Sequence, residues 1–271
     1  MTGASGRRWA VANQKFGNVP LPHARLPRWH STTATRSHGR ERPDWALIVP
    51  IPASLTTNRE LLFTRFGDTV PLVQCLQSRI VAGRPDADAV IAVAEALHAD
   101  VKAVLAAHDV RVKVTSVPGT ATREDCLSAA LAQVDDAVEY VLVHDIRRPL
   151  ASTDLADRVL DGLRDGNDVV VPALAMVDSV KTVDAAGAVT ETVDRSRLRS
   201  AQYPRGFHRR HLTAMLAGVE AADDFDELTL ARRAGVAPAV IDGDPDAFIL
   251  DIPRDIELAD AILGCRLAQQ R

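Results

Sequence analysis

Short apolar runs alternate with amphipathic stretches along the chain from Trp45 onward. The run WALIVPI at 45–51 is continuously apolar and is bounded by proline, with Pro52 directly after it. A continuous apolar run of this length is typical of a strand buried on both faces. Similar strands are predicted at 88–94, 111–117, 140–145 and 168–174, and amphipathic helices at 70–82, 95–108, 123–134 and 153–164. Strands that alternate with helices of this length predict βαβ units, and therefore an α/β fold with a mainly parallel sheet covered by helices.

The alternation ends after Leu174. Residues 178–196 predict two short polar strands around a turn at 185–187, a hairpin that should project from the body because it has few large apolar side chains. Since an isolated two-stranded ribbon is marginal in water, a second copy of the chain is expected to hold it. Beyond it the pattern predicts helices at 208–220 and 226–234, strands at 238–243 and 247–251, and a last helix from Pro253.

Residues 1–43 differ from the rest of the chain in charge and patterning. They carry eight Lys and Arg and one acid, whereas the remainder carries 24 basic and 35 acidic residues. With little hydrophobic periodicity, this segment is predicted to be a disordered basic extension ahead of one domain at 44–271. Its arginine- and serine-rich composition also fits an organelle-targeting segment or a site for an acidic partner. The acidic body argues against nucleic acid as a partner.

The composition adds two exclusions. The chain has 271 residues, 46% hydrophobic and 25% charged, as in an ordinary globular protein. No apolar run approaches the ~18–20 residues that cross a bilayer, so no membrane association is expected. The three cysteines (Cys75, Cys126 and Cys265) lack a metal-binding or paired spacing. A reducing, cytoplasmic location is therefore expected.

Polar residues follow the predicted strands where a ligand would bind, because open α/β sheets bind ligands beyond the carboxyl ends of their strands. The segments are 50–59, 119–125 and 145–149. In the last of these, Asp145 is followed by Arg147 and Arg148, and a carboxylate beside two guanidiniums suits a metal-bound polyphosphate. The alternative is structural: Asp145 pairs with Arg148 or caps the next helix.

Six segments resemble, in the same order, motifs of the 2-C-methyl-D-erythritol 4-phosphate cytidylyltransferase family. The family's motifs are G-G-x-x-R-x-D-S, V-x-V-H-D-A-A-R-P, D-T-x-K, T-V-D-R-S, A-Q-T-P-Q and T-D-E. The similar segments are, in turn, GTATREDC (119–126), VLVHDIRRPL (141–150), DSVK (178–181), TVDRS (192–196), AQYPR (201–205) and FDE (225–227). The resemblance spans roughly 45–265. It implies a doubly wound nucleotidyltransferase domain whose β-arm, about 177–205, exchanges contacts in a homodimer.

The resemblance also implies an activity. In this family CMP passes from CTP to 2-C-methyl-D-erythritol 4-phosphate, with Mg²⁺, in the non-mevalonate route to isoprenoid precursors. Carried onto this chain, the family's roles give nucleotide contacts at Pro50, Arg123, Asp125 and Asp145, the metal at Asp145, a catalytic cation at Arg148, and acceptor contacts at Ser179, Arg195 and Asp226.

The departures from the family's pattern fall on the nucleotide side. Family members continue from the first strand into P-A-A-G-x-G-x-R, whose glycines let backbone N–H groups wrap a triphosphate, whereas residues 50–60 contain no glycine. Two family lysines align with Leu61 and Ile249, and Arg59 is the nearest replacement for the missing charge. Three functions stay open: a cytidylyltransferase, a catalytically impaired homologue with a binding or regulatory role, and a nucleotidyltransferase for another sugar or polyol phosphate.

Overall fold

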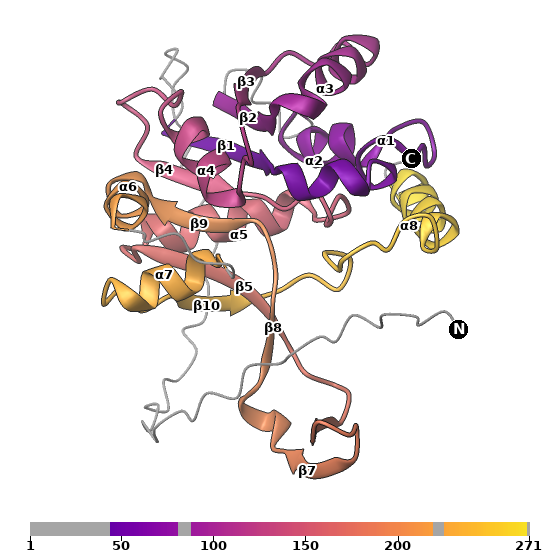
Figure 1. Cartoon of the computed structure of the whole chain (residues 1–271), viewed down its shortest axis with the longest axis vertical. Helices are drawn as coiled ribbons and strands as arrows, with labels where there is room; N and C mark the ends of the chain where they lie inside the picture. Colours follow the sequence, from indigo (N-terminus) through magenta and orange to yellow (C-terminus); the bar gives the residue numbers. More distant parts are fainter. Residues whose placement is uncertain (1–43, 81–87, 219–224, 270–271) are drawn as a thin grey trace, which may run out of the picture. The chain divides into compact units, whose positions relative to one another are not determined.

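The computed structural model describes residues 44–80, 88–218 and 225–269, and the predicted extension at 1–43 lies outside these ranges. Its sheet has eight strands in the order β10-β5-β9-β4-β1-β2-β3, with β8 paired to β5 (Figure 1). Strand β9 runs antiparallel to β4 and β5, β8 runs antiparallel to β5, and the other pairs are parallel. The strands are β1 (Trp45–Ile51), β2 (Asp88–Ala94), β3 (Lys113–Val117), β4 (Tyr140–Val143), β5 (Val169–Ala175), β8 (Arg199–Ala201), β9 (Arg205–His208) and β10 (Ala239–Asp242).

Strand β1 shows why both faces of this sheet are covered. Alternate side chains of a strand point to opposite faces, so Leu47 and Ile51 pack into one core cluster and Ala46 and Ile48 into the other. The first cluster includes residues of α2, α3, α5 and α8, and the second includes residues of α4, α6 and α7. These helices are α2 (Pro71–Ile80), α3 (Glu95–Ala107), α4 (Arg123–Leu131), α5 (Thr153–Arg164), α6 (Arg209–Ala217), α7 (Glu227–Arg233) and α8 (Ile256–Gln269). The mainly parallel, doubly wound sheet is confirmed.

Local sequence signals set the starts of two of these helices. Helix α4 begins with a capping box, in which the Thr122 hydroxyl accepts from the Asp125 N–H and the Asp125 carboxylate accepts from the Thr122 N–H. Helix α5 begins after Ser152, whose hydroxyl accepts from the Leu155 N–H over 3.2 Å. Among the described residues, no helix has the length and apolar character needed to cross a membrane.

The predicted strand at 247–251 is wrong. Its backbone joins the loop after β4 rather than a sheet edge: the Leu250 N–H donates to the Arg147 carbonyl over 2.9 Å. Ala247 and Leu250 are buried, so the apolar pattern there reports a packed loop and not a strand. The last helix, α8, begins at Ile256 rather than at Pro253, which lies in the preceding turn.

The predicted hairpin is present as β6 (Val180–Val183) and β7 (Val189–Val193), which pair only with each other within the described chain. Its turn is closed by the Asp184 carboxylate, which accepts from the N–H groups of Ala186 and Ala188, and by Gly187 at φ 87°. This arm extends away from the sheet beyond β8 (Figure 1). A short 3₁₀ helix, η2 (Arg195–Arg197), returns the chain to the body.

Candidate functional site

Four segments meet at the carboxyl end of strand β4. The Ala53 N–H donates to the Ala121 carbonyl over 2.9 Å and ties the segment after β1 to the turn before α4. Strand β9 is antiparallel, so it begins at this end, where Arg205 lies opposite Val143. Together with the loop after β4, these segments form the edge where α/β sheets bind ligands.

Asp145 lies directly beyond β4 and is held by its own loop. Its side chain is 3% exposed, and both carboxylate oxygens accept from Arg147. The Arg147 backbone N–H also donates to Oδ1 over 3.0 Å. Burial alone would raise the pKa of Asp145, but the hydrogen bonds and charge of Arg147, with the charge of Arg123, lower it to about 2. Asp145 is therefore a carboxylate with a fixed cationic partner.

Arg148 does not pair with Asp145, so the structural alternative of such a pair is wrong. Its guanidinium donates to the carbonyls of Ala247 and Ala201, the latter over 3.2 Å. It thereby ties the loop after β4 to the 247–250 segment and to the end of β8. Burial lowers the pKa of Arg148 below its ordinary value. As folded, this arginine holds two segments together, and its role as a catalytic cation stays a prediction.

Glu227 joins three side chains from distant parts of the chain. Its fully buried carboxylate accepts from Arg123 Nε over 2.8 Å, from the Tyr203 hydroxyl over 2.8 Å and from Arg205 over 2.6 Å, and the Nη2 of Arg123 lies 2.7 Å from Oε1 as an ion pair. Both guanidiniums lie over the Tyr203 ring, with that of Arg123 5.3 Å and that of Arg205 4.2 Å from the ring centre. Asp226 completes this Glu227 cluster by accepting from Arg205 and from the Thr229 N–H at the start of α7.

The Glu227 cluster shifts the pKa values of its members. Burial opposes the charge of Arg123, yet the nearby Glu227 raises its pKa above the ordinary value. Burial raises the pKa of Tyr203, and Glu227 raises it further. The Arg205 charge lowers the pKa of Asp226 against the effect of burial. At neutral pH both guanidiniums are thus charged and the phenol keeps its proton.

Three residues of this edge are not among the site residues predicted from the sequence: Tyr203, Arg205 and Glu227. Arg147 is pointed out by the sequence beside Asp145, but without a separate role. A departure from the family motifs marks three of these four residues. Arg147 stands where the similar motif has its second alanine, and Tyr203 and Arg205 stand where A-Q-T-P-Q has threonine and glutamine. Each substitution adds bulk or charge at the carboxyl edge. Together with Glu227, they form the contacts that organise the edge.

The segment after β1 is wound into a short helix rather than an open loop. Residues Ala53–Thr57 form the 3₁₀ helix η1, with Leu55 N–H bonded to the Pro52 carbonyl over 3.1 Å and Asn58 N–H to the Leu55 carbonyl over 3.1 Å. Backbone N–H groups used within such a turn are not available to cradle phosphate oxygens. Pro50, a predicted nucleotide contact, is buried within β1 and has no N–H to offer.

Arg59 and Asp125 both have partners outside a phosphate site. Arg59 pairs with Asp100 on α3, and its guanidinium lies 5.7 Å from the centre of the Phe63 ring in α1 (Glu60–Phe63). The carboxylate of Asp125 caps α4. Of the predicted nucleotide contacts, the structure therefore places Arg123 and Asp145 in mutual electrostatic range, while Pro50 and Asp125 serve local structure.

The predicted acceptor residues are divided between the arm and the body. Ser179 and Arg195 are exposed at the base of the arm, where Arg195 donates to the Val177 carbonyl. Asp226 belongs to the Glu227 cluster in the body. Within one described chain, Ser179 and Arg195 share no contact with the residues around Asp145. Their predicted role thus requires the arm of a second copy or a movement of this one.

The residues present do not fit Mg²⁺ as they stand. A magnesium ion bound to protein and polyphosphate needs free carboxylate oxygens in octahedral geometry. Such an ion is held by one or two carboxylates together with the phosphates, and here both oxygens of Asp145 are engaged by Arg147. Mg²⁺ stays a prediction from the resemblance, and it requires Arg147 to release Asp145.

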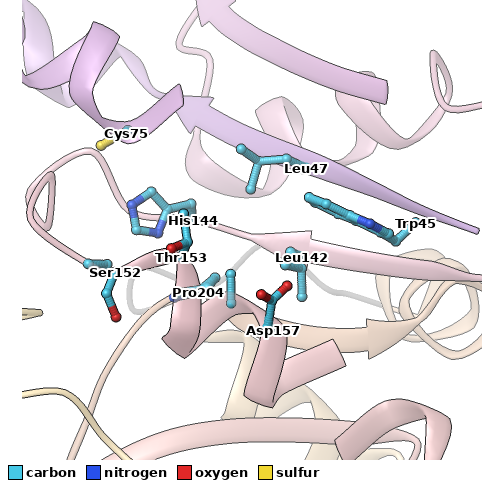
Figure 2. Close-up of a pocket in the computed structure, with 11 residues that line it drawn as sticks. Trp45, Leu47, Cys75, Leu142, His144, Ser152, Thr153, Asp157 and Pro204 are labelled. Atoms are coloured by element: carbon cyan, nitrogen blue, oxygen red, sulfur yellow. The ribbon is translucent and has the colours of Figure 1, made fainter. Parts of the chain in front are cut away.

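The cavity in Figure 2 lies between strands β1 and β4 and helix α5, and its lining includes neither Asp145 nor any member of the Glu227 cluster. The volume that the centre of a water molecule can reach in it is about 20 Å³. The cavity is therefore large enough for a single water molecule and far too small for a nucleotide. His144 lines it, with an Nδ1 that has no hydrogen-bond partner among the described residues. Burial lowers the pKa of His144 to about 4, so it is a neutral packed histidine at pH 7.

The fold and this edge define the class of the protein. Its fold is shared by two solved structures, whose matches cover 81% and 80% of this chain and 98% of their own chains. One is 4-diphosphocytidyl-2C-methyl-D-erythritol synthase from Anaerococcus prevotii, at 23% identity and TM-score 0.66. The other is 2-C-methyl-D-erythritol 4-phosphate cytidylyltransferase from Thermus thermophilus, at 24% identity and TM-score 0.61. At these identities the likeness shows a nucleotidyltransferase fold.

The sequence comparisons name the family. The profile of the 2-C-methyl-D-erythritol 4-phosphate cytidylyltransferases matches residues 58–265. The enzyme of that name from Rhodococcus jostii is 37% identical over 222 residues, 80% of this chain and 95% of its own. That from Nocardia farcinica is 37% identical over 231 residues, 83% and 97% of the two chains. The chain belongs to this family of the non-mevalonate isoprenoid pathway. The profile match begins at Asn58, just beyond η1.

Proposed function

We propose that this chain transfers CMP from CTP to 2-C-methyl-D-erythritol 4-phosphate. In this reaction a phosphate oxygen of the acceptor attacks the α-phosphorus of CTP, the bond to the β-phosphate oxygen breaks, and pyrophosphate leaves. Because two anions must approach each other, the protein has to position them and supply positive charge. The observation that carries the proposal is the gathering of Asp145, Arg123 and Arg147 at the carboxyl edge of the sheet.

The arm supports a second part of the proposal, a homodimer. Val183 and Val189 in the strands of the arm are 59% and 64% exposed, and Val177 in the loop before it is 78% exposed, so three apolar side chains are available to a partner on this arm. A two-stranded ribbon of this size needs a partner for stability. A second copy of the chain would cover these valines and bring Ser179 and Arg195 to the body of its partner. An acceptor phosphate would then lie between the arm hydroxyl and guanidinium.

One observation favours a second candidate function, an impaired homologue that binds or regulates without turnover. The segment after β1 lacks glycine, and its N–H groups close the turns of η1. Arg59 pairs with Asp100 instead of facing the edge. Removing one such stabilising group from a transition state typically slows a reaction ~10²–10³-fold, and several are absent here.

A pyrophosphate-release assay separates the two functions. Purified protein is given CTP with 2-C-methyl-D-erythritol 4-phosphate, with Mg²⁺ or with EDTA, beside the Asp145→Asn variant as a blank. Release above the blank supports the transferase. Release only with other sugar or polyol phosphates supports a changed acceptor. No release, together with calorimetric binding of the acceptor alone, supports the impaired homologue.

A further inference from the structure

Both oxygens of the Asp145 carboxylate accept hydrogen bonds from a single residue of the same loop, Arg147. The Arg147 Nε lies 3.0 Å from Oδ1 and 3.1 Å from Oδ2, and Nη2 lies 2.5 Å from Oδ2. The Arg147 backbone N–H adds a fourth contact, 3.0 Å to Oδ1. Charge-assisted, two-pronged contacts of this kind are among the strongest that a carboxylate makes.

The chain is built to keep Arg147 there. The partners are two residues apart, so little chain entropy is lost when they meet. The loop is fixed on its far side, where the Arg147 carbonyl accepts from the Leu250 N–H over 2.9 Å. Asp145 is almost fully buried, and a buried carboxylate without a partner is strongly disfavoured. An incoming cation must therefore replace the guanidinium rather than join it.

We infer that Arg147 occupies the place of a divalent cation at Asp145 and closes this carboxylate to metal binding. The guanidinium is half-exposed, and its Nη1 has no partner among the described residues, so it can donate to an anion at the edge. Asp145 with Arg147 is neutral, whereas a carboxylate with a divalent cation carries a net charge of +1. The edge consequently attracts phosphate less strongly than a metal-loaded one. This inference rests on the Asp145 contacts and holds for either candidate function.

Mn²⁺ binding to the protein alone tests the inference without any turnover. The free-Mn²⁺ signal in electron paramagnetic resonance is measured against protein concentration for the wild type and for Arg147→Ala, which restores the alanine of the similar motif. We expect Arg147→Ala to bind Mn²⁺ at least tenfold more tightly than the wild type. The double variant Arg147→Ala/Asp145→Asn should lose this gain. Arg164→Ala is the matched control, because it removes an arginine paired with Asp44 far along the chain.

The inference is overturned if the wild type binds Mn²⁺ as tightly as Arg147→Ala, if the gain persists in the double variant, or if Arg164→Ala shows the same gain. Circular dichroism checks that each variant is folded. Should Arg147→Ala not fold, Arg147→Gln removes the charge but keeps the bulk and one donor, and the same tenfold gain is expected of it.

Discussion

Replacing Glu227 with glutamine removes the charge shared by Arg123, Tyr203 and Arg205. The Glu227 side chain is fully buried, and those of Arg205 and Arg123 are only 8% and 19% exposed, so solvent cannot replace the lost carboxylate. Breaking a buried pair by removing one partner costs ~3–5 kcal/mol. Asp226 still contacts Arg205, which places Glu227→Gln near the lower limit, about 3 kcal/mol. For a chain of this size the thermal midpoint should fall by roughly 6–12 °C.

Urea denaturation followed by circular dichroism measures this loss. Glu139→Gln is the control, because Glu139 is 55% exposed and pairs with His208, and its loss should stay within about 0.5 kcal/mol. Without Glu227, Arg205 is a buried cation with a weakened partner, and adding Arg205→Gln to Glu227→Gln removes it. The loss of unfolding free energy in the double variant should therefore be smaller than the sum of the two single-variant losses by about 1 kcal/mol or more. A Glu227→Gln loss below about 1 kcal/mol, close to the control, would refute the view that this carboxylate compensates two buried charges.

If residues 50–60 cannot cradle a triphosphate, calorimetry should give a Kd for CTP at least tenfold weaker than micromolar, a difference of ~1.4 kcal/mol, and a grafted glycine-containing family loop with Ile249→Lys should recover binding; micromolar binding by the unaltered protein would contradict this. Replacing Val183–Glu191 by a short Gly linker should shift the protein toward monomer in analytical ultracentrifugation, and an unchanged dimer would place the interface elsewhere. His144, with its pKa lowered from near 6.5 to about 4, takes up a proton more readily when unfolded, so stability should fall as the pH drops through this window; urea midpoints at pH 7 and pH 5 should differ less in His144→Gln than in the wild type. A chain beginning at Pro43 should melt within a few degrees of the full-length protein, since the basic segment lacks the periodicity of a packed element, and a large drop would show that it packs on the body.

The order of the elements could be read from the chain because it rests on local periodicity. A continuously apolar strand such as 45–51 must be covered on both faces, whereas the amphipathic helix at 153–164 is covered on one face only. The alternation of such strands and helices therefore predicts a parallel sheet covered by helices. The start of α5 was equally local, since Ser152 caps it through a neighbour three residues away. The hairpin at 178–196 followed from its polar strands and turn residues.

The partners of the charged residues were decided by the tertiary structure. The sequence places Arg147 two residues and Arg148 three residues after Asp145, within reach of it in either case, but the guanidinium of Arg148 donates to the carbonyls of Ala247 and Ala201, and only that of Arg147 contacts the carboxylate. The predicted strand at 247–251 is a buried loop for a similar reason, because an apolar run has the same pattern whether it packs as a strand or as a loop.

The Glu227 cluster shows the physical reason most clearly. Its contacts join residues 104 and 22 positions apart, from α4 and β9 to the first turn of α7. Local sequence sets which residue types lie near each strand end, through periodicity and capping that act over a few residues. Which carboxylate meets which guanidinium depends on how the helices and strands pack, because a buried charge is stabilised only by the partner that the fold brings within hydrogen-bond distance.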